Sequence, residues 1–180
     1  KDKIAQYLVG RGFTEILTNS ITNSAYYTEE VVSRSVKMLN NLTAELDLMR
    51  PSMLETGLEA IAYNSNRKNN SISFFEIGKI YGKSETGKYY ESEQLALYLA
   101  GKQNTDGWRI KALPADFFVA KGIATALCQL LGLPQGHWQS SSAGQVNYII
   151  QKSTICTLES VSAKKLQSFG IKQAVFYIHF

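Results

Sequence analysis

The carboxylate of Glu76 has the most unusual surroundings of any ionisable group in the sequence. It lies in the run Phe74–Tyr81, where period-two alternation places Glu76 on an otherwise apolar strand face. A carboxylate in such surroundings must be paired with a cation or must shift its pKa. Two interpretations follow: a carboxylate of a functional site, or half of a structural ion pair with an arginine such as Arg50 or Arg67. We favour the ion pair.

The histidines and cysteines predict no further chemistry. His137 is expected in a loop and His179 in a last strand, and neither has a second ligand at the spacing that zinc sites use. Cys128 lies in a helical pattern and Cys156 in a strand pattern, so each is expected to be a small core residue. No P-loop, G-x-G-x-x-G or G-x-S-x-G motif occurs. We therefore expect no catalytic residue, no bound cofactor and no metal within this chain.

Composition indicates one folded domain, residues 1–180. Apolar residues make up 44% and charged residues 19%, which excludes a disordered chain, and no apolar run approaches the length of about 20 residues that a membrane helix needs. The net charge of +4 is only a weak indication of nucleic acid. Two free thiols suit a reducing cytoplasm. Since the chain starts at Lys1 and ends inside a strand-like run, we expect it to be a piece of a longer polypeptide.

Hydrophobic periodicity predicts four helices, one of which carries Cys128. The clearest is the helix after Asp116, which Gly132 should cap and Pro134 should prevent from continuing. Another is expected to begin after Pro51, because proline fits the first turn of a helix and disfavours helical geometry in the residue before it. The predicted helices cover residues 1–10, 54–64, 116–131 and 162–169.

Strand patterns alternate with these helices. The stretch Glu93–Gly101 is apolar on both faces and should be central in a sheet. The other predicted strands are residues 15–21, 72–83, 146–150, 154–158 and 174–180. This order predicts an α+β fold, an antiparallel sheet flanked by helices.

Four motifs follow one another along the chain: residues 11–20, 48–54, 74–81 and 116–122. In this order and spacing they closely resemble the β subunit of phenylalanyl-tRNA synthetase, and the likeness extends over essentially the whole chain. The resemblance implies a domain shaped like the catalytic core of class II aminoacyl-tRNA synthetases but without its active site. It also implies an α subunit that attaches phenylalanine to tRNA with ATP and Mg²⁺, in a cytoplasmic (αβ)₂ heterotetramer that binds tRNA as a whole.

The same resemblance implies that the first helix contributes to a subunit interface, for which Ile4, Tyr7, Leu8 and Arg11 are the candidates. Its apolar stripe could equally well be intramolecular core. The family's editing function, metal site and anticodon-stem binding are expected outside these residues. One local departure is the pair Ser162-Ala163, where members of the family often read His-Pro.

Gly82 is the departure that bears on chemistry. Class II enzymes supply a phosphate-binding arginine from a strand that reads G-[RK]-[VI]-[FY]-R, and the matching run Gly78–Gly82 ends in glycine. Adenylate formation needs fixed cations on the phosphate, and arginine supplies them with its bidentate fork. The second arginine motif, G-x-G-x-G-x-x-R, has no match in the 180 residues. The resemblance therefore implies a non-catalytic domain.

Two alternatives stay open at this point. A stand-alone ATP-dependent ligase of class II fold would need basic residues such as Arg50, Arg67 or Arg109 to converge on a phosphate. A general interaction domain with an unrelated partner would need no such convergence.

Overall fold

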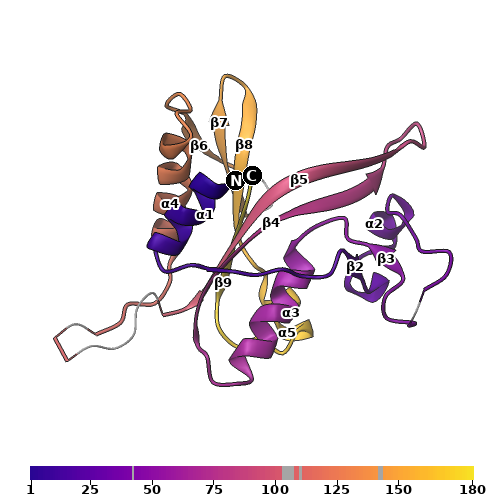
Figure 1. Ribbon diagram of the computed structural model, residues 1–180, viewed down its shortest axis with the longest axis horizontal. Helices are drawn as coiled ribbons and strands as arrows, with labels where there is room; N and C mark the ends of the chain where they lie inside the picture. Colours follow the sequence, from indigo (N-terminus) through magenta and orange to yellow (C-terminus); the bar gives the residue numbers. More distant parts are fainter. Residues whose placement is uncertain (42, 103–107, 110, 142–143) are drawn as a thin grey trace.

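A seven-stranded sheet forms the centre of the molecule (Figure 1). The computed structural model describes residues 1–41, 43–102, 108–109, 111–141 and 144–180. The strand order is β1-β4-β5-β9-β8-β7-β6, and every neighbouring pair is antiparallel except β1 with β4. The strands are β1 Thr14–Glu15, β4 Ser71–Lys83, β5 Tyr89–Gly101, β6 His137–Ser140, β7 Gln145–Ile150, β8 Ser153–Ser160 and β9 Val175–His179. The α+β prediction is confirmed, with one parallel pair at the edge.

Two layers of helices cover the sheet. Helices α1 (Asp2–Gly10) and α4 (Phe117–Leu130) pack on one face, and α3 (Leu54–Ser65) and α5 (Ala163–Ser168) pack on the other (Figure 1). Each layer closes over its own apolar cluster, because alternate residues of β4, β5 and β9 point to opposite faces. No helix of the described residues is long and apolar enough to cross a membrane.

Helix α4 has the ends that its sequence predicts. Asp116 caps its start, with its Oδ1 accepting a hydrogen bond of 2.8 Å from the Val119 amide. Gly132 follows its last turn with a φ of 69°, a left-handed conformation that glycine adopts without steric cost. The prediction of this helix is confirmed to within one residue at each end.

The prediction of one strand over residues 15–21 is wrong. Strand β1 ends at Glu15, and the next pairing is β2 (Ile21–Thr22) with β3 (Leu48–Met49) in a separate two-stranded sheet. Between them Thr18 turns toward Glu76, and the Asn19 side chain accepts a hydrogen bond from the Ile21 amide. These contacts bend the backbone away from the main sheet. The 3₁₀ helix η1 (Ser24–Tyr26) and helix α2 (Glu29–Ser33) follow.

His137 does not lie in a loop, as predicted, but begins the edge strand β6. This strand pairs with β7 through His137–Ile149 and the three pairs that follow. The Trp138 ring lies 5.1 Å from that of its cross-strand partner Tyr148, and such aromatic pairs stabilise sheets. The pattern was missed because only four residues form the strand and glycine and proline precede it.

Candidate functional site

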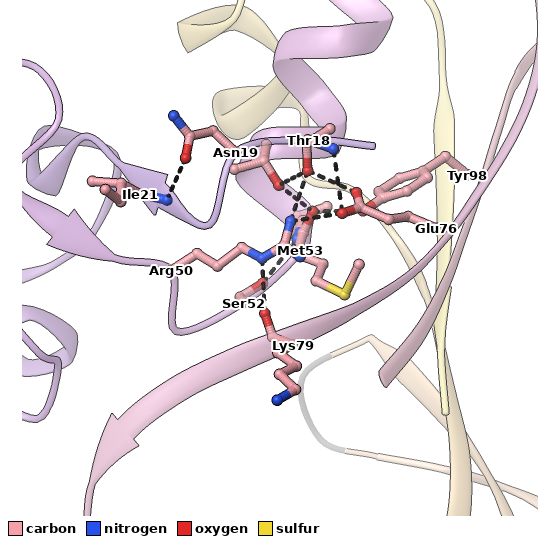
Figure 2. A network of polar contacts seen from close by, with 11 residues as sticks. Thr18, Asn19, Ile21, Arg50, Ser52, Met53, Glu76, Lys79 and Tyr98 are labelled. Carbon is pink, nitrogen blue, oxygen red and sulfur yellow. Dashed lines mark hydrogen bonds and ion pairs between the residues drawn. The ribbon is translucent and has the colours of Figure 1, made fainter. Parts of the chain in front are cut away.

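A buried polar cluster occupies the sheet face that α3 covers (Figure 2). Arg50 and Glu76 are 2% and 0% exposed, and Arg50 Nη1 lies 2.9 Å from Glu76 Oε1. Arg50 Nε also donates to the Lys79 carbonyl at 2.8 Å. The structure thus brings together the two residues that the sequence suggested as an ion pair.

Thr18 completes the cluster from a third segment. Its hydroxyl donates to Glu76 Oε2 at 2.7 Å and accepts from Arg50 Nη1 at 2.7 Å. Its backbone amide points at Glu76 Oε1 at 3.3 Å. Both carboxylate oxygens therefore have partners, which a buried charge requires. The cluster ties the segment after β1 and the segment after β3 to the centre of β4.

Two glycines make room for these side chains. A Cβ on Gly78 would lie 2.3 Å from Arg50 Nη2, so only glycine lets the guanidinium cross β4. A Cβ on Gly57 of α3 would lie 2.1 Å from the ring of Tyr98, whose hydroxyl donates to the Met53 carbonyl at 2.6 Å. The close approach of α3 to the sheet depends on this second glycine.

A second ion pair, with a buried carboxylate and a half-buried lysine, was not foreseen from the sequence. Lys165 of α5 lies 2.7 Å from Glu55 Oε1 of α3, and Lys165 also donates to the Tyr26 carbonyl at 2.8 Å. Helical spacing could have indicated Glu55, because it shares the buried face of α3 with Leu58. Its partner could not be found, since it lies far away in the sequence.

Three oxygen atoms near this pair have no hydrogen-bond partner within the described part of the chain: Thr22 Oγ1, Tyr27 Oη and Glu55 Oε2. Burial and the nearby Glu55 carboxylate raise the pKa of Tyr27. A neutral phenol in this place can turn its proton toward a carboxylate or a water molecule. Because Lys165 donates to the Tyr26 carbonyl as well as pairing with Glu55, the pair anchors the segment before α2 on α3 and α5.

The two thiols lie beside each other in the apolar core, and the imidazoles lie on other strands. Cys128 and Cys156 are free and buried, and burial raises the pKa of both, that of Cys156 to about 12. Burial lowers the pKa of His179, whose ring stacks on Tyr177 at 5.3 Å. Among the described residues, no group of three or more histidine, cysteine or acidic side chains could hold a metal ion.

The comparisons with known proteins fit this architecture. The family model described as the phenylalanyl tRNA synthetase beta chain CLM domain matches residues 1–180. The chain belongs to this family. The phenylalanine–tRNA ligase beta subunit of Bacteroides fragilis is 35% identical over 93% of the chain and 21% of its own length. That of Porphyromonas gingivalis is 28% identical over 97% of the chain and 23% of its own length.

The chain thus spans about a fifth of the length of these curated relatives. Among solved structures, pyrrolysyl-tRNA synthetase from Desulfitobacterium hafniense has a TM-score of 0.78 at 15% identity, covering 99% of this chain and 64% of that one. At this identity the likeness shows the fold alone. It confirms the class II synthetase architecture that the sequence predicted.

In this beta-chain domain, Tyr90 occupies the space beside Gly82, which stands where the class II pattern has an arginine. Gly82 pairs with Tyr90 across the β4–β5 hairpin, and a Cβ on Gly82 would lie 2.5 Å from the Tyr90 hydroxyl oxygen. The phenol lies across the bare backbone of Gly82. An arginine at this position would have to displace the Tyr90 ring.

A stand-alone ligase would require Arg50, Arg67 and Arg109 to converge on a phosphate. These three arginines do not converge. Arg50 is buried and held by Glu76. Arg67 stacks on Tyr63 at the end of α3, with its guanidinium carbon 3.4 Å from the ring centre. Arg109 lies over the exposed Trp108 at 5.8 Å. Each guanidinium has a different local partner.

The four candidate interface residues divide between core and surface. Leu8 is fully buried, and Ile4 and Tyr7 pack against the same apolar cluster. Leu8 therefore has no surface to offer a partner while α1 stays in place. Arg11 is exposed and donates to the Tyr7 hydroxyl at 2.9 Å.

Proposed function

We propose that this domain is a non-catalytic structural part of a phenylalanine–tRNA ligase beta subunit, which supports an alpha subunit that carries the chemistry. The alpha subunit would attach phenylalanine to tRNA with ATP and Mg²⁺, in a cytoplasmic (αβ)₂ assembly that binds tRNA as a whole. The domain itself would bind neither ATP nor metal.

One observation carries this proposal: the sheet face that should bind phosphate has no free arginine at the expected strand position. By period-two alternation, residue 82 projects from the same face of β4 as Glu76. Gly82 offers no side chain, and Tyr90 lies across it. Arg50 on this face is 2% exposed and neutralised by Glu76. Neither position 82 nor Arg50 therefore offers a free cation to the charge that develops on a phosphate.

ATP binding and adenylate formation test the proposal directly. Full-length beta subunit alone should show no heat of ATP binding by titration calorimetry and no phenylalanine-dependent ATP–pyrophosphate exchange. The complex with the alpha subunit should show both. Robust exchange by the beta subunit alone would disprove a non-catalytic role.

A variant of the cluster separates structural support from catalysis. Glu76→Ala in the full complex should lower the yield of assembled tetramer, while the exchange rate per assembled tetramer stays within about twofold of wild type. This follows because a residue that acts on folding changes the amount of active enzyme rather than its transition-state stabilisation. A large loss of rate in intact tetramers would contradict the structural role.

A further inference from the structure

The two cysteines of the chain meet between a helix and a strand. Cys128 lies in α4 and Cys156 lies in β8, and both side chains belong to the apolar cluster on the same face of the sheet. Helix α4 packs on β8 and β9 at this end of the molecule (Figure 1). The two sulfur atoms are close enough to share a hydrogen bond. Folding thus brings together two thiols that the β6–β7 hairpin separates in the sequence.

A cavity of about 520 Å³ reaches one of these thiols and not the other. It lies between the second half of α4, the turn at residues 133–136 and the strands β6 and β7. Its lining includes Cys128, which is 1% exposed, but not Cys156, which is 2% exposed. A volume of this size accommodates a small molecule. A small reagent that enters the cavity therefore meets Cys128 first.

Hydrogen bonds fix the aromatic wall of this cavity. The indole Nε1 of Trp138 donates to Thr125 Oγ1 of α4 at 3.3 Å, and the Gly136 amide donates to the Tyr148 hydroxyl at 2.8 Å. The rings of Trp138 and Tyr148 lie 5.1 Å apart. Because these contacts join α4, the turn and the two strands, the opening beside Cys128 is built by the tertiary structure.

The two thiols also differ in how readily they ionise. Burial raises the pKa of Cys156 to about 12, and the neighbouring Cys128 adds to this rise. Burial raises the pKa of Cys128 as well, but a hydrogen bond with Cys156 opposes that rise. The thiolate is the form that attacks a disulfide. Access and ionisation therefore favour the same residue, Cys128, as the thiol that reacts first.

A disulfide suits this position better than a metal ion does. Two thiolates around a soft monovalent cation such as Cu(I) would leave a net negative charge in an apolar cluster, which is costly. A disulfide is neutral and keeps the apolar cluster free of charge. The chemistry of the pair is therefore oxidation rather than metal binding.

We propose that Cys128 and Cys156 form a thiol–disulfide exchange pair. A small disulfide such as oxidised glutathione enters the cavity and reacts at Cys128, and Cys156 then closes a disulfide bond between α4 and β8. The bond closes a loop that contains β6 and β7, so it ties this edge of the sheet to the helix.

The exchange proceeds in two balanced steps. Cys128 loses its proton, and its sulfur attacks one sulfur of the entering disulfide, whose S–S bond breaks and releases one glutathione thiol. Cys156 then loses its proton and attacks the Cys128 sulfur, which releases the second glutathione thiol. Two protein thiols are oxidised to one disulfide, and one glutathione disulfide is reduced to two thiols.

Mass spectrometry of the folded, full-length beta subunit tests the proposal. The reduced wild-type protein is exposed to oxidised glutathione, its remaining thiols are alkylated, and it is digested with trypsin. Cleavage after Lys121, Lys152 and Lys164 places Cys128 in peptide 122–152 and Cys156 in peptide 153–164. We expect a disulfide that joins these two peptides and that dithiothreitol breaks. Unlinked peptides from the folded protein, under conditions in which the urea-unfolded protein reacts at both cysteines, would overturn the proposal.

Two matched variants test the order of the steps. Cys156→Ala removes the second thiol, so the mixed disulfide should accumulate and peptide 122–152 should gain the mass of one glutathionyl group. Cys128→Ala removes the thiol beside the cavity, so peptide 153–164 should stay unmodified in the folded protein. Equal glutathione uptake by the two variants, or uptake by Cys128→Ala alone, would contradict this order. The wild-type experiment involves no substitution and decides the question if either variant fails to fold.

Discussion

The two faces of the seven-stranded sheet are built from the same strands and each carries an apolar cluster, but the face under α3 and α5, the polar face, also buries the charged pair of Arg50 and Glu76. One cross-strand row reads Phe75, Leu97, Ile178, Leu158 and Val146, which are all apolar. The adjacent row on the other face reads Glu76, Ala96, His179, Thr157 and Asn147. A shift of one residue along each strand thus separates an entirely apolar row from a mostly polar one.

The comparison shows what the buried charges of this synthetase-like sheet hold together. The apolar face, under α1 and α4, is packed as core. The polar face is the one from which residue 82 projects, and its charged groups neutralise one another. Its arginine and carboxylate hold segments of the chain together in place of a ligand.

The largest effect is expected from breaking the Arg50–Glu76 pair. Glu76→Ala leaves the buried guanidinium unpaired and should lower the free energy of unfolding by about 3–5 kcal/mol, measured by urea denaturation. The double variant Arg50→Met/Glu76→Leu should lie closer to wild type, since it leaves no unpaired charge. Lys79→Ala breaks an exposed ion pair with Glu91 and should leave the midpoint unchanged. Equal losses for Glu76→Ala and Lys79→Ala would refute the role of burial.

The apolar face should respond through cavity formation. Leu127→Ala in α4, at a fully buried position, should cost about 2–5 kcal/mol of unfolding free energy. Phe118→Ala on the same helix is the control, because its ring is exposed and its loss should change stability by about 0.5 kcal/mol or less. A comparable loss at Phe118 would show that this ring is covered within the domain.

A smaller loss is expected from overpacking α3 on the polar face. Gly57→Ala would drive a methyl group into the Tyr98 ring and should cost about 1–3 kcal/mol in the same urea experiment. Gly10→Ala in α1, where a Cβ meets nothing within 4 Å, is the matched control and should be neutral or stabilising. A stable Gly57→Ala protein would mean that α3 can move away from the sheet.

The smallest effect is a pH dependence from His179. Burial lowers the pKa of its imidazole below the usual 6.5, so the unfolded chain takes up this proton at a higher pH than the folded chain. The stability from the neutral imidazole is complete above about pH 6.5 and is lost as the pH falls through the lowered pKa. His179→Gln should reduce the loss of stability between pH 7.5 and 5.5. The exposed His137→Gln should not, and an equal change in both would exclude this origin.

Much of the fold was predictable because the signals are local. The long helix α4 shows its periodicity, its N-cap at Asp116 and its glycine stop within one stretch of sequence. The strands that correspond to β7 and β8 were predicted from their patterns, and Gln151 and Lys152 form the turn between them with φ of 49° and 79°. Short pairings were not predictable. Strand β1 has two residues and pairs with the distant β4, and the four residues of β6 follow a proline and a glycine.

The candidate site was predictable in part. Alternation along β4 identified Glu76 as a carboxylate that needed a partner and left Arg50 and Arg67 as candidates. Only the fold distinguishes them, because β3 delivers Arg50 to the centre of β4 while the end of α3 carries Arg67 away from it. Helical spacing places Glu55 on the buried face of α3, but no local pattern points to its partner Lys165.

The sequence by itself determined the helices, the long strands, the family resemblance and the glycine in place of an arginine. The tertiary structure decided that Tyr90 fills the position beside Gly82 and that Leu8 is core. It also decided that Arg50, rather than Arg67, pairs with Glu76. The division has a physical reason. Backbone conformation and amphipathic pattern are set by neighbours in the sequence, whereas the partner of a charge and the space beside a glycine depend on segments that only folding brings together.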